Sequence, residues 1–188
     1  MPMIRESIVV TVSAAGRPHI APLGLIAEGD RWIIAPFRPS TTLDNLMAVP
    51  FATIGHTDDV RIFAGCLTGR YDWPTVPADG IPVPRLADAL AHMELAVEQV
   101  REDPQRPRLV CRVLREVAHA PFRGFNRAQA AVIEAAILTS RLSMLPRDKI
   151  EREIGYLQIA VDKTAGPRER EAWDWLMTKV HAHLAGET

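Results

Sequence analysis

The residues best suited to chemistry lie in one short stretch, residues 35–42, which we call the corner segment. Arg38 precedes three consecutive hydroxyl side chains, Ser40, Thr41 and Thr42, and a short helical pattern follows them. A hydroxyl at a helix start accepts hydrogen bonds from the free amides of the first turn, and these amides attract anions. The guanidinium of Arg38 adds donors that match the oxygens of a phosphate. These residues predict a phosphate site, but taken alone they favour an ordinary capped strand-to-helix turn.

The remaining polar clusters give weaker signals. His56 stands two residues before Asp58–Asp59, a group that could bind a metal, but paired aspartates in turns commonly serve local hydrogen bonding. His19 lies in a predicted strand, where an isolated histidine is usually structural. Asn126–Arg127 at a helix start is a possible ligand contact, and a cap followed by a solvated arginine explains it equally well. We therefore predict no metal site, and we assign no catalytic residue.

Composition limits the classes of partner. The 188 residues include 22 basic and 23 acidic side chains, for a net charge of −1. Such a balance provides no long-range attraction for nucleic acid. The hydrophobic fraction of 47% is typical of a globular protein. Cys66 and Cys111 are far apart and lack the spacing of metal ligands, so two free thiols are expected.

Targeting signals are also limited. The first residues, Met1 to Ser7, lack the long apolar core of a signal peptide. No uncharged apolar run approaches the ~20 residues needed to span a bilayer. We therefore expect a cytoplasmic protein without a membrane span.

The first third of the chain has the pattern of a β meander. Ile8 to Val12 is almost entirely β-branched, and a turn at residues 14–17 places Gly16 where a left-handed backbone is needed. Pro22 in the return strand predicts an edge, a bulge or a barrel corner. The expected elements are strands at 8–12, 19–27, 31–35 and 51–54, a short helix ending at 48, a strand or helical turn at 60–64, and an extended proline-rich loop at 73–84.

Residues 86–117 fit two patterns. Leu86, Leu90, Met93 and Val97 lie at helical spacing, while alternation of apolar and polar residues from 93 to 98 is typical of a strand. A turn follows at 102–107, and residues 108–117 are β-like. Two runs on either side of a proline-rich turn favour a hairpin.

The last third is predicted to be helical, at residues 127–144, 147–161 and 168–184. On the first of these helices one face is apolar, formed by Ala130, Ile133, Ile137 and Leu138 and broadened by Val132, Ala136 and Thr139. An apolar, alanine-rich face of this kind packs closely against another element or a partner. No internal repeat is present.

The order of elements resembles a flavin-binding split barrel, as in pyridoxine-phosphate oxidase and flavin-reductase-like proteins. More closely, the chain resembles a domain-of-unknown-function family of flavoproteins from archaea and from bacteria with methanopterin-linked one-carbon metabolism. The matching segments cover most of the chain, with the corner segment and the Asn-Arg helix start most distinctive; they are residues 5–11, 16–24, 36–46, 56–59, 125–128 and 132–142.

The resemblance implies an α+β protein: a split β-barrel at residues 1–120 that binds FMN without a covalent link, and a helical subdomain at 121–188 packed on it. It also implies a homodimer with flavin near the subunit interface. The family usually has asparagine where His56 stands. The implied cofactor-binding residues are His19, Phe37, Arg38, Ser40, Thr41, Thr42, Asn45, His56, Asn126 and Arg127.

The function expected from this resemblance is an FMN-dependent oxidoreductase. It would move a hydride or electrons between FMN and an unidentified small molecule, for which a pterin-like compound is a candidate. The alternative is a non-catalytic FMN-binding or scaffold protein in a biosynthetic complex. A third possibility is a split barrel that has lost flavin and binds another phosphate-bearing molecule.

Overall fold

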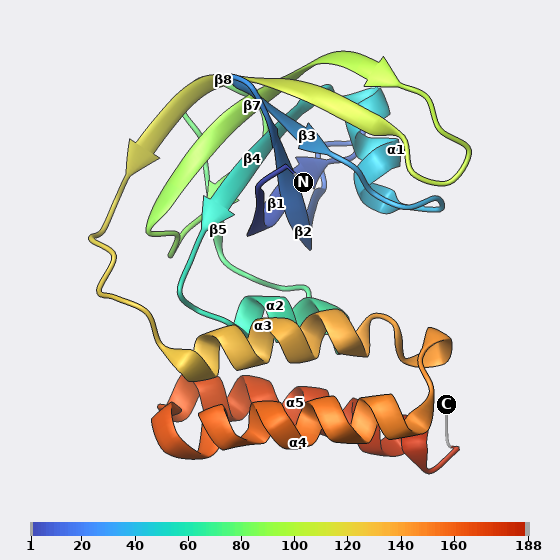
Figure 1. Ribbon diagram of the computed structural model, residues 1–188. Coiled ribbons are helices and arrows are strands. Elements are labelled where there is room, and N and C mark those ends of the chain that lie inside the picture. Colours follow the sequence, from blue (N-terminus) through green and yellow to red (C-terminus); the bar gives the residue numbers. More distant parts are fainter. Residues whose placement is uncertain (1, 187–188) are drawn as a thin grey trace. The chain divides into compact units, whose positions relative to one another are not determined.

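The computed structural model describes residues 2–186, which form two compact units (Figure 1). The barrel unit contains residues 2–57 and 72–122, and the helical unit contains residues 58–71 and 123–186. A single division at residue 120 was expected from the sequence. The structure instead groups residues 58–71 with the C-terminal helices.

The barrel unit is a closed, six-stranded antiparallel barrel, and together with the helices of the chain it confirms the expected α+β class. Its closure depends on pairing between the first and fourth strands, in which Val9 faces Ile54 and Ile8 faces Gly55. In order around the barrel the strands are β1 (Ile4–Val12), β2 (Pro18–Glu28), β3 (Arg31–Ile34), β8 (Arg108–Ala118), β7 (Ala91–Arg101) and β4 (Phe51–His56).

The β1–β2 hairpin follows the sequence closely. Gly16 has φ +75°, and its amide donates to the Ser13 carbonyl at 2.8 Å. A residue with a Cβ is strained at this φ, which explains the glycine. Pro22 faces Ile8 of β1, in a stretch of β2 that has no register with β3. Proline is tolerated there because this part of β2 pairs with β1 and not with β3, so the missing amide hydrogen interrupts no ladder on the β3 side.

The barrel interior is closed by a short helix, α1 (Thr41–Ala48). Leu43 and Leu46 of α1 belong to the same buried cluster as the strand residues. The strands that α1 connects, β3 and β4, are not neighbours in the sheet. The other members of the cluster are Val9, Leu25, Ile34, Ala52, Ile54, Met93, Leu95, Leu109 and Cys111.

The ambiguous region after residue 86 is a strand. Met93 and Leu95 are buried in β7, while Glu98 and Gln99 are exposed, so the strand interpretation is confirmed and the helical one is wrong. The proline-rich loop before it contains a short antiparallel ladder that was not expected. Its strands are β5 (Thr75–Val76) and β6 (Arg85–Leu86).

The helical unit contains four α-helices among its described residues: α2 (Arg61–Leu67), α3 (Arg127–Thr139), α4 (Arg147–Thr164) and α5 (Pro167–Leu184). Residues 60–64 are therefore mostly helical. The continuous helix expected to Met144 is wrong, because α3 ends at Thr139 and a 3-10 turn, Leu142–Met144, follows. Within residues 2–186, each helix is too short or too polar to span a bilayer.

The expected face of α3 is confirmed in part, since Val132, Ala136, Leu138 and Thr139 are buried. The other expected residues are not. Ala130 is exposed, and Ile133 and Ile137 are only half-buried. The helix contacts α2, α4 and α5, so three neighbours decide which side is covered. The buried residues of α3 are Ala128, Ala131, Val132, Ala135, Ala136, Leu138 and Thr139. The buried alanines therefore allow close packing inside the helical unit.

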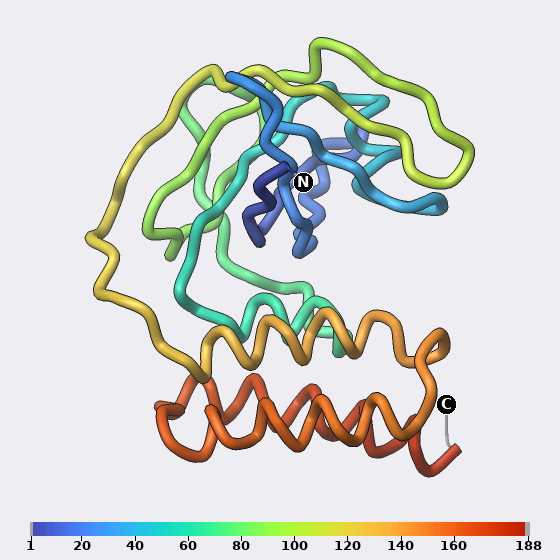
Figure 2. The backbone as a smooth tube through the Cα atoms, in the orientation of Figure 1, coloured from blue at the N-terminus to red at the C-terminus, as the bar shows by residue number. Residues whose placement is uncertain are grey.

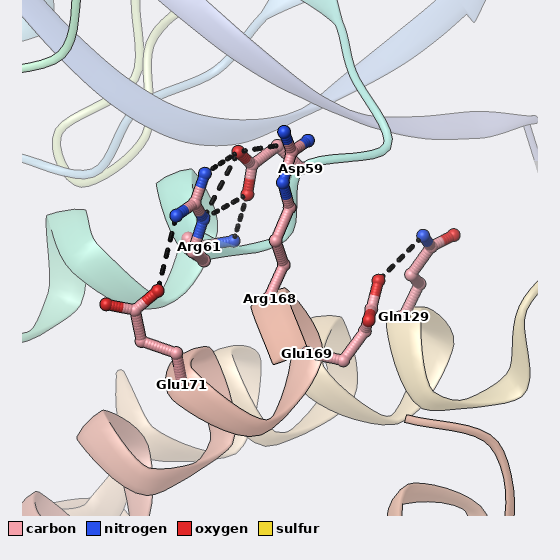
Figure 3. Close-up of polar contacts among 6 residues, drawn as sticks. All are labelled: Asp59, Arg61, Gln129, Arg168, Glu169 and Glu171. Carbon is pink, nitrogen blue, oxygen red and sulfur yellow. Dashed lines mark hydrogen bonds and ion pairs between the residues drawn. The ribbon is translucent and has the colours of Figure 1, made fainter. Parts of the chain in front are cut away.

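A cluster of partly buried ion pairs joins the start of α2 to α5 (Figure 3). Asp59 accepts hydrogen bonds from the Arg61 side chain at 2.6 and 2.9 Å and from its backbone amide at 3.1 Å. Arg61 also donates to Glu171 at 3.2 Å, and Arg168 lies 3.8 Å from Asp59. Burial opposes ionisation of Asp59, but the hydrogen bonds and charge of Arg61, with the charge of Arg168, hold its pKa below the usual value.

We predict that Asp59→Asn lowers the stability of the helical unit at neutral pH by about 2 kcal/mol, because Arg61 loses its buried counter-ion. The pKa of Asp59 is lower in the folded than in the unfolded protein. Its contribution is therefore present above the ordinary value of 3.8 and is lost as pH falls through the folded pKa.

Thermal unfolding of wild type and variant, followed by circular dichroism from neutral to acidic pH, measures this difference. The melting temperatures should converge in acid. Asp58→Asn, which changes the neighbouring carboxylate, is the matched control. A pH-independent difference between wild type and Asp59→Asn would contradict the prediction.

Candidate functional site

The corner segment connects β3 to α1 and begins the helix with a side-chain cap. Ser40 has an extended backbone, and its Oγ accepts from the Leu43 amide at 3.4 Å. Thr41 is exposed, whereas Thr42 is buried. The predicted capped turn is therefore present. Its first-turn amides and hydroxyls lie at the positive end of the α1 dipole, an arrangement that suits an anion.

A buried hydrogen bond fastens α1 to the barrel wall. Asn45 is 6% exposed, and its Nδ2 donates to Thr11 Oγ1 of β1 at 3.0 Å. His19 stands directly opposite Thr11 in the β1–β2 register, and cross-strand partners share a face of the sheet. His19 is therefore on the face that meets α1. Partial burial lowers its pKa, which favours a neutral imidazole.

Arg38 and Phe37 project from the exposed side of the corner segment. The Arg38 side chain is 44% exposed and pairs with Glu102 at 3.1 Å. Phe37 is 60% exposed, and the Arg106 guanidinium lies 4.7 Å from its ring centroid. Sequence reasoning identified Arg38 and Phe37 but missed their partners, because Glu102 and Arg106 lie in the turn between β7 and β8.

His56 lies toward the other end of β1 from the Thr11–Asn45 contact. Its Nδ1 is 3.4 Å from the Ser7 hydroxyl, and Ser7 precedes Thr11 by four residues, or about 13 Å of strand. Burial and the nearby Arg5 charge lower the pKa of His56, partly opposed by Glu116. Within one chain the structure does not bring His56 to the corner segment.

The Asn-Arg pair belongs to the helical unit. Asn126 is the N-cap of α3, with its Oδ1 accepting from the Ala128 amide at 2.8 Å and its Nδ2 donating to the Thr164 carbonyl at 3.1 Å. Arg127 is exposed. The cap interpretation is therefore confirmed for Asn126, whose side chain joins the ends of α3 and α4. A cofactor contact by either residue stays a prediction.

Sequence reasoning missed one buried titratable cluster in the barrel unit. Glu94 is fully buried and accepts hydrogen bonds from the Asp79 and Gly80 amides at 3.1 and 3.0 Å. His92 lies 3.5 Å from Glu94, and its Nδ1 is 2.8 Å from Nε2 of the exposed His119. The available signal was the spacing of His92 and Glu94, since residues two apart in a strand share a face.

This cluster has a structural explanation. Glu94 holds the loop between β5 and β6 against β7, and a Cβ on Gly80 would approach Glu94 Oε2 to 2.6 Å. A residue with a Cβ at position 80 would therefore displace the Glu94 carboxylate from its present position. Among the described residues, no group of three or more histidine, cysteine, aspartate or glutamate side chains has a geometry that could hold a metal ion.

The two cysteines form no disulfide. Cys66 and Cys111 are both buried and lie in different units. Burial raises the pKa of Cys111 to about 12, so its thiol is protonated at neutral pH.

Two family models cover most of the chain. The model described as "Protein of unknown function (DUF447) N-terminal domain" matches residues 5–120, and a second DUF447 model matches residues 126–178. No curated protein matches the chain.

Solved structures show the same fold at low sequence identity. An FMN-bound protein of the same family from Methanosarcina mazei aligns over 95% of this chain and 96% of its own, with 20% identity and a TM-score of 0.81. A putative flavin reductase with a split-barrel domain from Shewanella frigidimarina aligns over 66% and 74%, with 13% identity and a TM-score of 0.55. An FMN-binding protein from Thermus thermophilus aligns over 63% and 71%, with 15% identity and a TM-score of 0.51.

We predict that Asn45→Ala destabilises the barrel unit by about 2 kcal/mol, because it leaves the buried Thr11 hydroxyl without its described donor. Urea-induced unfolding followed by circular dichroism measures the loss. Asp44→Ala, an adjacent and exposed change on the same helix, is the control and should have a much smaller effect. Equal effects of the two substitutions would show that the Asn45–Thr11 bond contributes little.

Proposed function

We propose that this chain, which belongs to the DUF447 family, is a flavoprotein that binds FMN at the corner segment. The observation that carries the proposal is the start of α1: three hydroxyls and an arginine at the first turn of a helix that is fastened into the barrel. The fold of an FMN-bound family member, which matches nearly the whole chain, supports the same assignment.

The residues present fit the phosphate group of FMN. Ser40, Thr41 and Thr42 supply hydroxyls, the first-turn amides supply backbone donors, and Arg38 supplies a planar fork of charged donors. Two carboxylates oppose the anion, Asp44 in the first turn and Glu102 beside Arg38. The donors outnumber the opposing groups, and both carboxylates are exposed to water, which screens their repulsion.

The protein supplies binding and orientation in this proposal. Arg38 and the hydroxyls of the corner segment bind the phosphate, while the packing of Leu43 and Leu46 keeps the start of α1 in place. His19 and Phe37 are the proposed neighbours of the flavin ring. When bound, FMN supplies hydride- or electron-transfer chemistry. We assign no side chain a role in proton transfer.

The first prediction of this proposal is a selective loss of FMN affinity. Arg38→Ala and Thr42→Val should each weaken FMN binding by about tenfold to a hundredfold, because each removes a donor to the dianionic phosphate. Riboflavin lacks that phosphate, so its affinity should be unchanged. Titration of the purified apoprotein, followed by flavin fluorescence, gives both affinities.

Arg152→Ala is the matched control, since Arg152 is an exposed arginine of α4 in the helical unit. It should bind FMN as the wild type does. Wild-type protein that shows no flavin absorption and takes up no added FMN would exclude the proposal.

Oxidoreductase activity is the finer part of the proposal. We expect the FMN-loaded protein to accept electrons from a reduced nicotinamide under anaerobic conditions and to pass them to a small-molecule acceptor. The sequence resemblance makes a pterin-like compound a candidate for this acceptor. From the same resemblance we also propose that the protein forms a homodimer, and we propose a cytoplasmic location. If no electron donor reduces the bound FMN, the result would favour the alternative, a non-catalytic FMN-binding or scaffold protein.

A further inference from the structure

The turn between β7 and β8, residues 102–107, is attached to the corner segment at several points. Figure 2 shows this yellow-green turn beside the blue segment that enters α1. The Arg38 amide donates to the Gln105 carbonyl at 2.8 Å, and Arg106 Nε donates to the Ala35 carbonyl at 2.8 Å. The backbone of the corner segment is therefore held in place by a turn that lies some 70 residues further along the chain.

The turn is itself ordered by one carboxylate. Asp103 accepts hydrogen bonds from the backbone amides of Arg106 at 2.7 Å and Gln105 at 2.9 Å. These bonds, helped by the charge of Arg38, lower the pKa of Asp103 and keep it ionised. Asp103 therefore presents the Arg106 side chain to the corner segment in a defined direction.

Arg106 makes two different contacts with the corner segment. Its Nε bonds the Ala35 carbonyl, and its guanidinium stacks over the Phe37 ring at 4.7 Å. A planar guanidinium can stack flat on the ring while its edge N–H groups donate, whereas a lysine ammonium has no planar face to stack. Arg38, which directly follows Phe37, meets Glu102 of the same turn at 3.1 Å.

We propose that the β7–β8 turn is the second half of the FMN phosphate site, an inference that rests on the function proposed above. Arg106 is a positioning residue that holds Ala35 and Phe37 so that Arg38 and the hydroxyls converge on one phosphate. Glu102 is an internal competitor that occupies Arg38 until the phosphate displaces it. A phosphate dianion displaces the carboxylate because it carries more charge and more acceptor oxygens.

The effects expected at these two positions have opposite signs. Glu102 is largely exposed, and exposed ion pairs are weak, so Glu102→Gln should strengthen FMN binding by only about threefold. Arg106→Ala removes a charge-assisted hydrogen bond and a ring contact, so it should weaken FMN binding by about tenfold. Riboflavin affinity should change little in Glu102→Gln, because the competition concerns the phosphate alone.

The experiment measures FMN and riboflavin affinities for wild type, Glu102→Gln, Arg106→Ala and Arg106→Lys. Glu98→Gln is the matched control, since Glu98 is a carboxylate in nearby β7 that also pairs with arginines, Arg31 and Arg112. If Arg106 positions the segment, Arg106→Lys should bind FMN as weakly as Arg106→Ala. Full rescue by lysine would reduce the role of Arg106 to its charge and overturn the positioning claim.

The outcomes separate the two levels of the proposal. Wild-type protein that binds no FMN overturns the proposed function and this inference together. Wild-type protein that binds FMN, with Glu102→Gln unchanged or with its FMN and riboflavin affinities raised equally, overturns the competition alone. Arg106→Lys keeps the charge of the side chain, so it provides the measurement if Arg106→Ala fails to fold.

Discussion

The packing of Leu43 and Leu46 into the barrel interior is the interaction on which the candidate site depends. The strands that α1 joins, β3 and β4, lie on different sides of the closed barrel, so the chain has to pass the barrel end between them. The two leucines are almost fully buried in the main core cluster. Their burial stabilises the helix, which is too short to be stable by itself, and directs its N-terminus.

Polar contacts add to the leucine packing and fix the orientation of α1 and of the segment before it. The Asn45–Thr11 hydrogen bond determines the rotation of α1 against β1, and the attachment of residues 102–107 determines the path of the corner segment before the helix. The site is therefore built from three parts of the barrel unit that are distant in sequence. Its electrostatics are balanced rather than strongly positive, because Glu102 and Asp44 stand near Arg38 and the helix dipole.

The helical unit uses a different principle. Its α3 carries small residues that allow close contact with three other helices. The partly buried Asp59–Arg61 pair at the start of α2 adds ion pairs to Arg168 and Glu171 of α5. Such a pair gives little net stability over an apolar contact, but breaking it is costly, so it favours one arrangement of the helices. This explains why residues 58–71, although inserted between parts of the barrel in sequence, group with the C-terminal helices.

Local patterns in the sequence determined the β-branched strand before Gly16, the capped start of α1, the helix cap at Asn126 and the overall α+β character. Each depends on neighbouring residues, whose propensities and spacing are visible in the chain itself. Tertiary structure decided the rest: which face of α3 is buried, and that Glu102 and Arg106 meet Arg38 and Phe37. A periodic pattern states which side of an element is apolar, but only the neighbours that cover it determine which side is buried. Contacts across some 70 residues depend on barrel closure, for which a single sequence carries no direct signal.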